Sequence, residues 1–428
     1  MKSTARAHFH SQARRKKNVT NTEHVYSIAY YSIIVIQTLA FALPTPVGAD
    51  IRILAGREQF AQAKSTRPEF LDFFAGSGLV SYALKSSFDC VWANDISAKK
   101  AAVYAANHGS NHFALGSIEG VRGADLPTTE MMWASFPCQD LSLAGATSGI
   151  HAPRSGLVWQ WLRIVDEMHC RPPVLVAENV VGLIATARGA HYRLLHRALA
   201  ERGYAVGAIV VDASMWLPQS RVRVFVIAVD KSIAIPQNLV ATSPGWLQNE
   251  SMRRASAVLD DFVWWNATPP QIGRSPLSAL IDWDAPFPAP EIEARNIALI
   301  ARHHRAILDA IPAETPFVAP GYRRTRNGVQ TLELRFDDTA GCLRTPEGGS
   351  SRQLLVLRRG GRWRCRLLTA REAARLMGAP DNYQLPERYN DAYMAMGDAV
   401  AVPVVDWLGK TFLRPLVDAA RAADAQSH

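Results

Sequence analysis

The sequence predicts an α/β fold: a mostly parallel sheet with helices on both faces, followed by a smaller and more irregular region. Short apolar runs, rich in β-branched and aromatic residues, alternate with helix-like segments between about Arg67 and Asp230. Such alternation is typical of a parallel sheet, because each connecting helix covers one of its faces. The chain has 428 residues, of which 48% are hydrophobic, and this is enough for one large domain and a smaller one.

Strand and helix candidates follow one another in order along this part. The strand candidates are short and apolar, whereas the helix candidates mix apolar and polar residues at helical spacing. The expected strands are EFLDFF (69–74), FDCVWAND (88–95), MMWASFP (131–137), PVLVAEN (173–179) and VRVFVIAV (222–229). The expected helices between them are LVSYALKSS (79–87), SAKKAAVYAANHG (97–109), SGLVWQWLRIVDEMH (155–169) and HYRLLHRALAERG (191–203).

The pattern changes in the C-terminal half. Residues 231–340 are rich in Pro and Trp and show little periodicity, apart from one continuous helix expected at 292–311. Nine arginines and only two acidic residues lie between Arg344 and Arg375, which predicts a concentrated positive surface. Two helical segments, 369–378 and 401–420, close the chain.

Charge and cysteine content narrow the class of protein. The formal net charge of +9 fits an anionic partner such as nucleic acid but does not identify it. Residues 1–50 carry six Lys/Arg and two Asp/Glu, so nearly half of the surplus lies in this tail. The five cysteines form no CxxC pair, which argues against a zinc cluster or a dithiol redox site and fits a reducing compartment. We expect no metal site.

A glycine-rich turn, DFFAGSG (72–78), lies between a strand and a helix. Gly76 and Gly78 allow a tight turn and close approach of a ligand, and the helix N-terminus beyond them offers free N–H groups. The next strand ends at Asp95, where a carboxylate can accept hydrogen bonds from ribose hydroxyls. The pair indicates a cofactor that contains adenosine. The alternative is a structural glycine turn and a surface aspartate.

Two further strand ends carry reactive side chains. Cys138 in SFPCQDLS follows a strand, so its thiol can reach a substrate, whereas Cys90 and Cys170 are candidates for structural roles. Glu178 ends the strand VLVAENV at the sheet edge where open α/β sheets bind ligands, and a partly buried carboxyl can hold a proton near neutral pH. The alternatives are an inert thiol and a glutamate that caps the next helix.

Arg221 and Arg223 in PQSRVRVFVIAV lie two residues apart where a strand begins, so they share a face. Two guanidinium groups on one face suit a phosphate or the carbonyl-rich edge of a base. The alternative is a solvated strand end.

Taken together and in order, these motifs closely resemble the DNA (cytosine-5) methyltransferase family of prokaryotic type. The resemblance runs from about Glu69 to Leu416 and adds REAARLMGAPDNY (371–383) and MGDAVAVPV (396–404) to ANDIS, FPCQ, ENV and QSRVR. It implies the Rossmann-like fold of class I S-adenosylmethionine-dependent methyltransferases, with S-adenosylmethionine as cofactor and double-stranded DNA as substrate.

The resemblance also implies an order of domains. Residues 1–53 form an N-terminal extension and residues 54–230 form the catalytic and cofactor-binding domain. Residues 231–365 form the target-recognition region, and residues 366–428 complete the catalytic domain.

The implied chemistry assigns a role to each reactive residue. Cys138 matches the family nucleophile, which adds to carbon 6 of cytosine so that carbon 5 can attack the methyl group. Glu178 matches the acid that protonates ring nitrogen 3, and Arg221 and Arg223 match arginines that bind the base or position the nucleophile loop. The base first swings out of the helix, at a cost of about a few kcal/mol.

The cofactor contacts implied by the resemblance include two departures from the family pattern. Ser117 stands where the family usually has an acid that contacts the adenine amino group, so we expect weaker rather than lost binding. Asp398 replaces the asparagine of the commoner GNxV. The implied contacts are Asp72, Phe73, Gly76, Gly78, Asp95, Ile96, Ser117, Ile118, Pro137 and Asp398.

The region 231–365 is expected to read DNA. GCLRTPEGGSSRQ (341–353) looks like the family segment that organises it, and Tyr322 and Arg326 belong to a candidate contact loop. The implied DNA contacts are Gln139, Gln219, Arg323, Arg324, Arg344, Ser350 and Arg352. For any single arginine, the alternative is a solvated surface charge.

Two alternative functions remain. The same chemistry occurs on transfer RNA, although a long variable region favours a duplex reader. A catalytically silent DNA-binding relative is disfavoured by the intact catalytic motifs. The resemblance also leaves room for a partner restriction endonuclease, and we expect a monomer.

The N-terminus suggests a different location. ARRKK (13–17) and the uncharged run from Val25 to Leu43 read as a signal peptide or a membrane span, which would give an exported or anchored protein. We favour a start codon assigned too far upstream, because the rest of the sequence is typical of an enzyme that acts on intracellular DNA. We therefore expect a cytoplasmic, nucleoid-associated protein.

Overall fold

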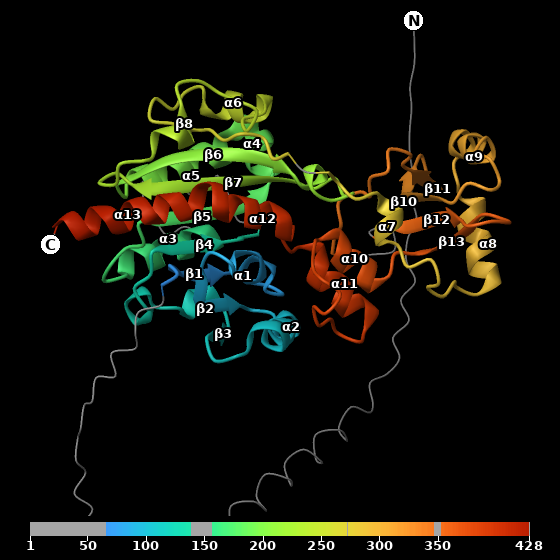
Figure 1. The fold of residues 1–428 in the computed structure, drawn as a ribbon, viewed down its shortest axis with the longest axis horizontal. Helices are drawn as coiled ribbons and strands as arrows, with labels where there is room; N and C mark the ends of the chain where they lie inside the picture. Colours follow the sequence, from blue (N-terminus) through green and yellow to red (C-terminus); the bar gives the residue numbers. More distant parts are fainter. Residues whose placement is uncertain (1–65, 138–155, 272, 346–351, 428) are drawn as a thin grey trace, which may run out of the picture. The chain divides into compact units, whose positions relative to one another are not determined.

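The computed structural model describes residues 66–137, 156–271, 273–345 and 352–427. Its larger sheet has seven strands in the order β3-β2-β1-β4-β5-β7-β6 (Figure 1). They are β1 (Glu69–Phe73), β2 (Asp89–Asp95), β3 (Phe113–Leu115), β4 (Met131–Ala134), β5 (Val174–Val180), β6 (Tyr204–Asp212) and β7 (Val222–Asp230). Each strand expected from the sequence is present, and β3 and β6 are additional.

The sheet is mostly parallel, as predicted. β1, β2, β3, β4 and β5 pair in parallel, whereas β7 runs antiparallel to both β5 and β6. β6 lies at the edge of the sheet and runs antiparallel to β7, so a short connection joins the two strands without a crossover helix. The antiparallel β7 places its first residues, and so Arg223, beside the end of β5.

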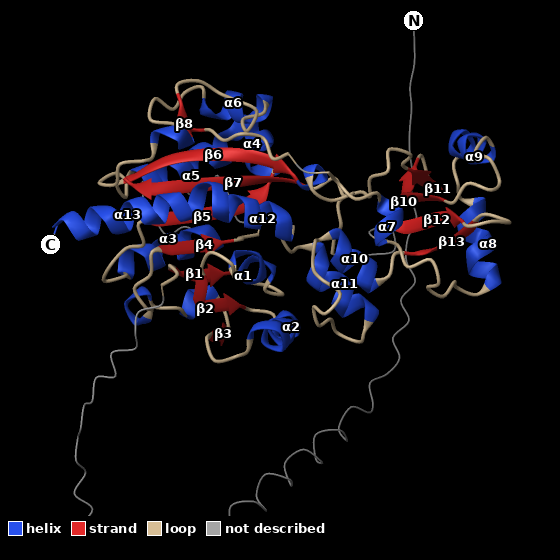
Figure 2. Ribbon diagram, viewed as in Figure 1, coloured by secondary structure: helices blue, strands red, loops and turns tan. Residues whose placement is uncertain are grey.

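Successive side chains along the strands point to opposite faces of the sheet, and each face packs against its own helices (Figure 2). Phe70, Trp133 and Phe225 pack against α1 (Leu79–Leu84), α12 (Val402–Leu408) and α13 (Arg414–Ser427). Leu71 and Met132 pack on the other side. The helices there are α3 (Leu157–Glu167), α4 (Gly182–Ala185), α5 (Ala190–Ala200) and α6 (Glu250–Ser256). The prediction of helices on both faces is therefore confirmed.

Residues 231–265, which the sequence assigns to the recognition region, pack on the edge strand β6. The short strands β8 (Val240–Ala241) and β9 (Trp264–Trp265) pair with each other, and the Val263 amide donates to the Val206 carbonyl at 2.9 Å. A methyl group on Gly207 would lie 2.1 Å from the Val263 carbonyl oxygen, so the two segments are in close contact. The segment directly after residue 230 therefore packs against the larger sheet.

A second, antiparallel sheet has the order β11-β10-β12-β13. Its strands are β10 (Phe317–Arg326), β11 (Val329–Leu334), β12 (Leu354–Arg358) and β13 (Arg364–Leu367). The short helix α7 (Leu277–Leu280) precedes it in the chain. A small core that includes Leu308, Leu332 and Val356 fills the space between this sheet and the helices before it.

The continuous helix expected at 292–311 is a wrong prediction, because the structure has two helices there, α8 (Pro290–Ala298) and α9 (Arg302–Asp309). The break has a tertiary cause: the Leu332 amide donates to the Leu299 carbonyl at 2.6 Å, and the Ala301 amide donates to the Leu332 carbonyl at 3.2 Å. A strand of the second sheet therefore takes the backbone groups that would have continued the helix.

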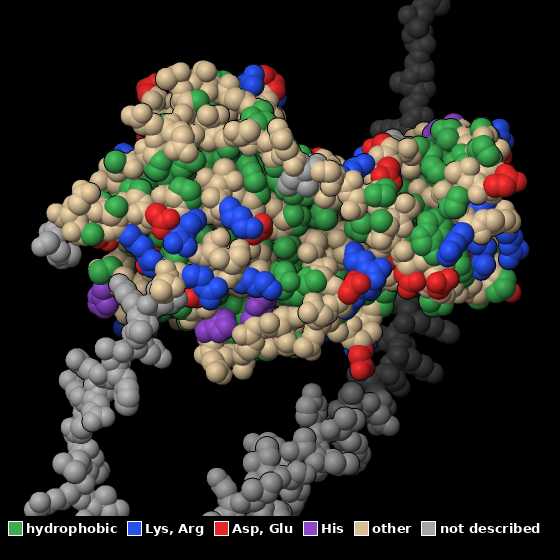
Figure 3. Space-filling model, viewed as in Figure 1, with side chains coloured by type: hydrophobic (Ala, Val, Ile, Leu, Met, Phe, Trp, Pro, Cys, Tyr) green, Lys and Arg blue, Asp and Glu red, His purple; other side chains and the backbone are tan. Residues whose placement is uncertain are grey.

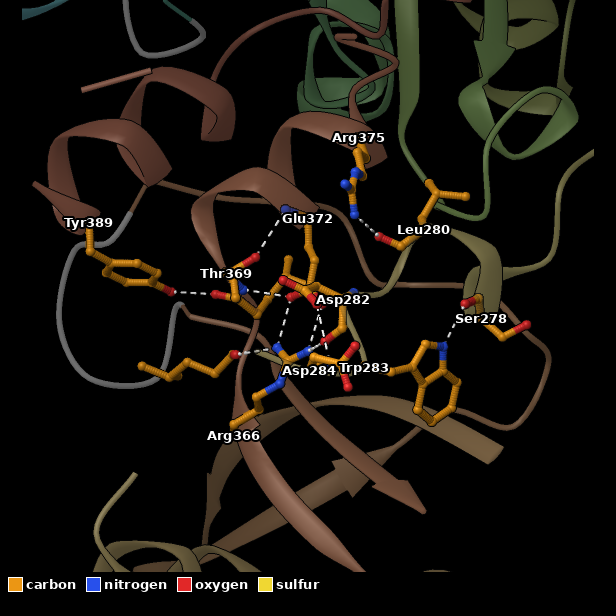
Figure 4. Close-up of polar contacts among 12 residues, drawn as sticks. Ser278, Leu280, Asp282, Trp283, Asp284, Arg366, Thr369, Glu372, Arg375 and Tyr389 are labelled. Atoms are coloured by element: carbon orange, nitrogen blue, oxygen red, sulfur yellow. Dashed lines mark hydrogen bonds and ion pairs between the residues drawn. The ribbon is translucent and has the colours of Figure 1, made fainter. Parts of the chain in front are cut away.

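A buried ion pair joins the second sheet to the C-terminal helices (Figure 4). Arg366 of β13 and Glu372 of α10 (Ala370–Leu376) contact each other through two hydrogen bonds of 2.7 and 2.8 Å, and both side chains are almost fully buried. The same carboxylate accepts from the amides of Thr369 and Asp282, so it caps α10 and holds the chain before the second sheet.

The arginine-rich stretch contributes more to the fold than to a positive surface, which corrects the expectation. Arg358 donates to the carbonyl of Pro312 and lies over the Trp363 ring, and Arg364 pairs with Glu293. Arg375 pairs with Asp381 at 2.7 Å. Most of these guanidinium groups therefore have protein partners.

Basic and acidic side chains also lie beside one another on the face shown in Figure 3, along α13. Arg414 pairs with Asp418 at 2.8 Å, and Arg421 pairs with Glu130. Because their charges are paired, these basic side chains attract nucleic acid only weakly.

Among the described residues, no helix is long and apolar enough to cross a bilayer. The run from Val25 to Leu43 lies outside the described residues. Two further helices, α2 (Ala98–His108) and α11 (Tyr389–Gly397), carry or precede residues of the site described next.

Candidate active site

A cavity of about 650 Å³ opens at the carboxyl ends of β1, β2, β4 and β5. Open α/β sheets bind ligands at this edge, because the loops that leave the strands diverge there. The lining comes from residues 74–77, 79–80, 94–96, 116–118, 135–137, 178–180, 342–345 and 397–400, with Lys100, Leu157 and Arg223. Segments that are far apart in the sequence therefore meet at one site.

The glycine-rich turn after β1 adopts the backbone conformation that its sequence suggests. Gly76 and Gly78 have positive φ angles of 57° and 86°, and Gly78 precedes α1. A methyl group on Gly78 would lie 2.6 Å from the His108 ring and 2.9 Å from Tyr104, so only glycine fits between the turn and α2.

Asp95 holds this turn. Its two carboxylate oxygens accept hydrogen bonds from the Gly76 amide at 3.0 Å and from the Ser97 amide at 2.8 Å. A carboxylate has further lone pairs, so Asp95 can still accept from a ligand in the cavity. The predicted pairing of the glycine turn with the acid of the next strand is present in the structure.

The aromatic side chain at the cavity is that of Phe74 and not that of Phe73, which was predicted to contact the cofactor. Phe73 is fully buried, with its ring 4.8 Å from that of Trp92, and it does not line the cavity. Phe74 lines the cavity instead, with a positive φ of 58° that is uncommon for a bulky residue. The sequence places two phenylalanines side by side, and only the turn geometry distinguishes them.

Asp72, another predicted cofactor contact, does not line the cavity. Its side chain is fully buried and accepts a hydrogen bond from the Ser81 hydroxyl at 2.9 Å. Burial raises the pKa of Asp72 to about 7, which the Ser81 hydrogen bond partly offsets. Asp72 and Gly78 therefore support the turn from behind rather than contacting a ligand.

Ile96, Ser117 and Ile118 line the cavity as predicted residues of the cofactor site. The Ile96 side chain is 73% exposed, so an apolar group stands open to a ligand there. The Ser117 hydroxyl accepts from the Glu119 amide at 3.3 Å, which fixes its position. Asn94, which sequence reasoning missed, donates to the carbonyl of Gly116 at 3.0 Å and holds this loop.

Glu178 and Arg223 form an ion pair on the cavity wall. Arg223 Nε lies 3.0 Å from Glu178 Oε1, and the two side chains are 14% and 8% exposed. Burial raises the pKa of Glu178 above its ordinary value, and this effect outweighs the positive charges of Arg223 and Arg221, which lower it. The site thus holds a carboxyl group with an increased tendency to carry a proton, beside a fixed cation.

Arg221 lies near the same glutamate but has a different role. It is fully buried, does not line the cavity, and donates from Nη1 to the Leu343 carbonyl at 3.0 Å and from Nη2 to the Gly397 carbonyl at 3.2 Å. Burial lowers its pKa to about 10, so it remains charged at neutral pH. Arg221 therefore joins two loops of the cavity wall, and only Arg223 faces the cavity.

Asn179 of β5 holds the residues that directly precede the predicted nucleophile. Asn179 donates through its side-chain amide to the Phe136 carbonyl at 3.0 Å, and Pro137 lines the cavity. Cys138, the next residue in the chain, lies outside the described residues, as does Gln139.

Several residues predicted to contact DNA are engaged within the protein. Gln219 is fully buried and donates to the Leu376 carbonyl at 2.6 Å, and Arg323 donates to the Asn296 side chain at 2.6 Å. Arg352 donates to the Asn390 side chain at 2.7 Å. Gln219 in particular is a structural residue, because it has no exposed surface.

Arg324 and Arg344 instead line a second cavity of about 840 Å³, between α9 and the β10–β11 pair. Tyr322 and Arg324 alternate with Arg323 along β10, so the first two share the face that Arg323 does not. Arg344 and Cys342 line both cavities, which connects them. Ser350 and the Arg326 side chain are not among the described parts.

With this geometry in place, the family can be assigned. The model of the C-5 cytosine-specific DNA methylase family matches residues 69–266 and 305–414, which is most of the chain. The chain belongs to this family. It is a DNA cytosine-5 methyltransferase, and the match spans the loops of the first cavity and the second sheet.

Curated relatives agree with this assignment, and a solved structure shares the fold. The Type II methyltransferase M.NlaX of Neisseria lactamica is 25% identical over 356 residues, which covers 79% of this chain and 93% of that protein. M.MspI of Moraxella sp is 25% identical over 355 residues, covering 81% and 71%. The crystal structure of the S. pombe Dnmt2 methyltransferase aligns with a TM-score of 0.54 at 16% identity, over 82% of this chain and 99% of that one, and shows that the fold is shared.

Proposed function

We propose that this methyltransferase transfers a methyl group from S-adenosylmethionine to carbon 5 of a cytosine within one short duplex DNA sequence, through a covalent bond from Cys138. The observation that carries the proposal is the joining of three elements in one cavity: Asp95 at the glycine turn, Pro137 directly before Cys138, and the Glu178–Arg223 ion pair.

The described residues fit such a cofactor. Its adenine is flat and largely apolar, and Phe74, Ile96 and Ile118 present apolar side chains to the cavity. Its ribose carries two hydroxyls, and Asp95 is the acceptor nearest the glycine turn. A volume of about 650 Å³ lies in the usual range for cofactor sites. When bound, the cofactor supplies an electrophilic methyl group.

The protein residues supply the remaining chemistry. The Cys138 thiolate adds to carbon 6 of cytosine, the ring electrons move towards nitrogen 3, and the Glu178 carboxyl donates its proton there. Carbon 5 would then accept the methyl group that a bound cofactor supplies. A base removes the proton on carbon 5, and the thiolate leaves while the proton on nitrogen 3 returns to Glu178. Arg223 holds the Glu178 carboxyl in place and faces the cavity that would take the base.

The second cavity is the proposed DNA-reading surface. Arg324 and Arg344 line it, and arginine is the commonest partner of the guanine edge in the major groove. Since Arg344 also lines the first cavity, a duplex on the second cavity could present its flipped base to the first. No observation in the described residues favours transfer RNA.

The relatives named as Type II methyltransferases support a restriction-modification setting, with an endonuclease that acts on the same sequence. We further propose that the protein acts as a monomer in the cytoplasm, associated with the nucleoid, and that residues 54–230 and 366–428 form its catalytic part and residues 231–365 its recognition part.

Transfer of a labelled methyl group tests the function directly. The purified chain and its Cys138→Ala variant are incubated with labelled S-adenosylmethionine and either duplex DNA or transfer RNA. We expect label in DNA with the wild-type chain alone. Label in transfer RNA only would overturn the substrate, and equal labelling by the alanine variant would overturn the covalent mechanism.

A further inference from the structure

Lys100 is a cation in the cofactor cavity to which neither the sequence motifs nor the proposed mechanism assigns a role. It lies on α2, and its ammonium group forms an ion pair with Asp398. The two side chains are 21% and 40% exposed, and both line the first cavity. A methyl group on Gly76 would lie 3.9 Å from Lys100 Cδ, so the aliphatic part of Lys100 lies over the glycine turn.

The loop that carries Asp398 is held from several sides. Arg221 donates to the carbonyls of Gly397 and Ala399, and the Ser77 hydroxyl donates to the Ala395 carbonyl at 2.8 Å. These bonds fix the backbone of the loop, but none of them fixes the Asp398 side chain. Lys100 supplies that contact and ties the loop to α2.

The charges in this part of the cavity explain why a cation is needed. Asp398 and Asp95 both present carboxylates to the cavity. Burial lowers the pKa of Lys100, but the two carboxylates together outweigh burial, so the pKa is raised. Without Lys100, the Asp398 carboxylate would stand unbalanced in a cavity that also takes the carboxylate of the cofactor's amino-acid end. The Asp398 carboxylate and the carboxylate of the cofactor would repel each other in one cavity, and the Asp398 side chain would turn away to relieve the repulsion.

We propose that Lys100 is a positioning residue for the cofactor: it pairs with Asp398 and so holds the 397–399 loop as a fixed, charge-balanced wall of the cofactor cavity. The proposal rests on the proposed function, because the cofactor is taken to be S-adenosylmethionine. It also accounts for an aspartate at a position where the resemblance leads one to expect asparagine, since Lys100 neutralises the added charge.

The neighbouring residue provides a matched control. Lys99 lies on the same helix and pairs with Asp391 at 2.8 Å, but it is 64% exposed and does not line the first cavity. Replacing either lysine by methionine keeps most of the aliphatic side chain and removes one charge and one ion pair. A difference between Lys100→Met and Lys99→Met therefore reports on the place of the pair rather than on net charge.

The test is calorimetric titration of the full chain, without DNA, with S-adenosylmethionine and with its product S-adenosylhomocysteine, which lacks the sulfonium charge. We expect Lys100→Met to raise both dissociation constants by similar factors of about five to ten, and Lys99→Met to change them by less than about twofold. In Lys100→Met, the further change Asp398→Asn should recover most of the loss, because asparagine needs no cation.

Three results would overturn the proposal: wild-type affinity in Lys100→Met, an equal loss in Lys99→Met, or tighter binding of the charged cofactor with unchanged binding of its neutral product. The last result would assign a simple charge effect to Lys100. A wild-type chain that binds neither compound would instead refute the proposed function, which separates the two failures. Thermal melting of each variant checks that the fold is intact.

Discussion

Replacing Glu178 by glutamine tests the acid that the mechanism requires. The amide has nearly the same shape as the carboxyl group and can still accept the hydrogen bond from Arg223, which lies 3.0 Å away. It cannot deliver a proton to ring nitrogen 3. Loss of a positioned general acid lowers a rate by about 10²- to 10⁴-fold, which corresponds to about 3–5 kcal/mol of barrier.

The same substitution has a smaller effect on stability. Glu178 and Arg223 are largely buried, and glutamine leaves the Arg223 charge without its anion. We expect the change in the free energy of unfolding to stay within about 1 kcal/mol, because the raised pKa of Glu178 shows that the fold already favours the uncharged form, which glutamine resembles. The fold should therefore survive, and the loss of rate can be read separately.

The pH profile gives a sharper readout. The pKa of Glu178 is raised in the folded protein, so the native state holds this proton more tightly than the unfolded chain does. Its contribution to stability is full below the ordinary pKa and is lost as the pH rises through the folded pKa. The methyl-transfer rate should fall over the same range, since the protonated form is the active one.

Single-turnover methyl transfer across pH is the assay. We expect the wild-type rate to fall on the alkaline side through this ionisation and the Glu178→Gln rate to be low and flat there. A glutamine variant with a rate close to that of the wild type would refute the role of Glu178 as proton donor, and so would an unchanged alkaline limb.

Three further predictions concern the turn, the buried ion pair and the reading surface. Gly78→Ala should cost about 1–3 kcal/mol of unfolding free energy and weaken cofactor binding, because the added methyl group meets the His108 ring. Gly109 has an equally positive φ but open space around it, so Gly109→Ala should cost about 1 kcal/mol. Thermal melting of the two variants compares these costs. Glu372→Gln should cost about 3–5 kcal/mol in denaturant unfolding, since it breaks a fully buried pair, and a loss below 1 kcal/mol would contradict this. Arg324→Ala should change DNA affinity or site preference with little effect on melting, whereas Arg323→Ala should lower melting instead; the reverse pattern in gel-shift and melting assays would contradict the assignment.

Sequence patterns predicted the larger sheet well because its strands are bounded by polar or glycine-rich turns. β1, β2 and β5 are apolar runs that end in Phe73, Asp95 and Val180, and the cavity is lined by Asp95, by Val180 and by Phe74, the residue directly after β1. β6 was missed although Gly203 ends the helical segment before it, because Gly207 interrupts its apolar run, and β3 has only three residues. The helix at 292–311 was predicted as continuous because the hydrogen bonds from Leu332 that divide it come from a distant strand.

The residues of the candidate site could be predicted by type more easily than by role. Phe74 and Phe73 differ in the direction of their side chains, which follows from a positive φ that no sequence pattern specifies. Arg221 and Arg223 look equivalent on a strand, yet carbonyls from Leu343 and Gly397 engage only the first. Lys100 carried no motif, because its partner lies 298 residues away in the chain.

The central claim is that this chain methylates cytosine in duplex DNA through Cys138. We would express the chain, alongside its Cys138→Ala variant, in a bacterium that lacks cytosine methylation and sequence the host DNA after bisulfite treatment. The account predicts protected cytosines confined to one short sequence with the wild-type chain and none with the variant. Soluble wild-type protein that leaves every cytosine unprotected, or protection that persists in the variant, would contradict it.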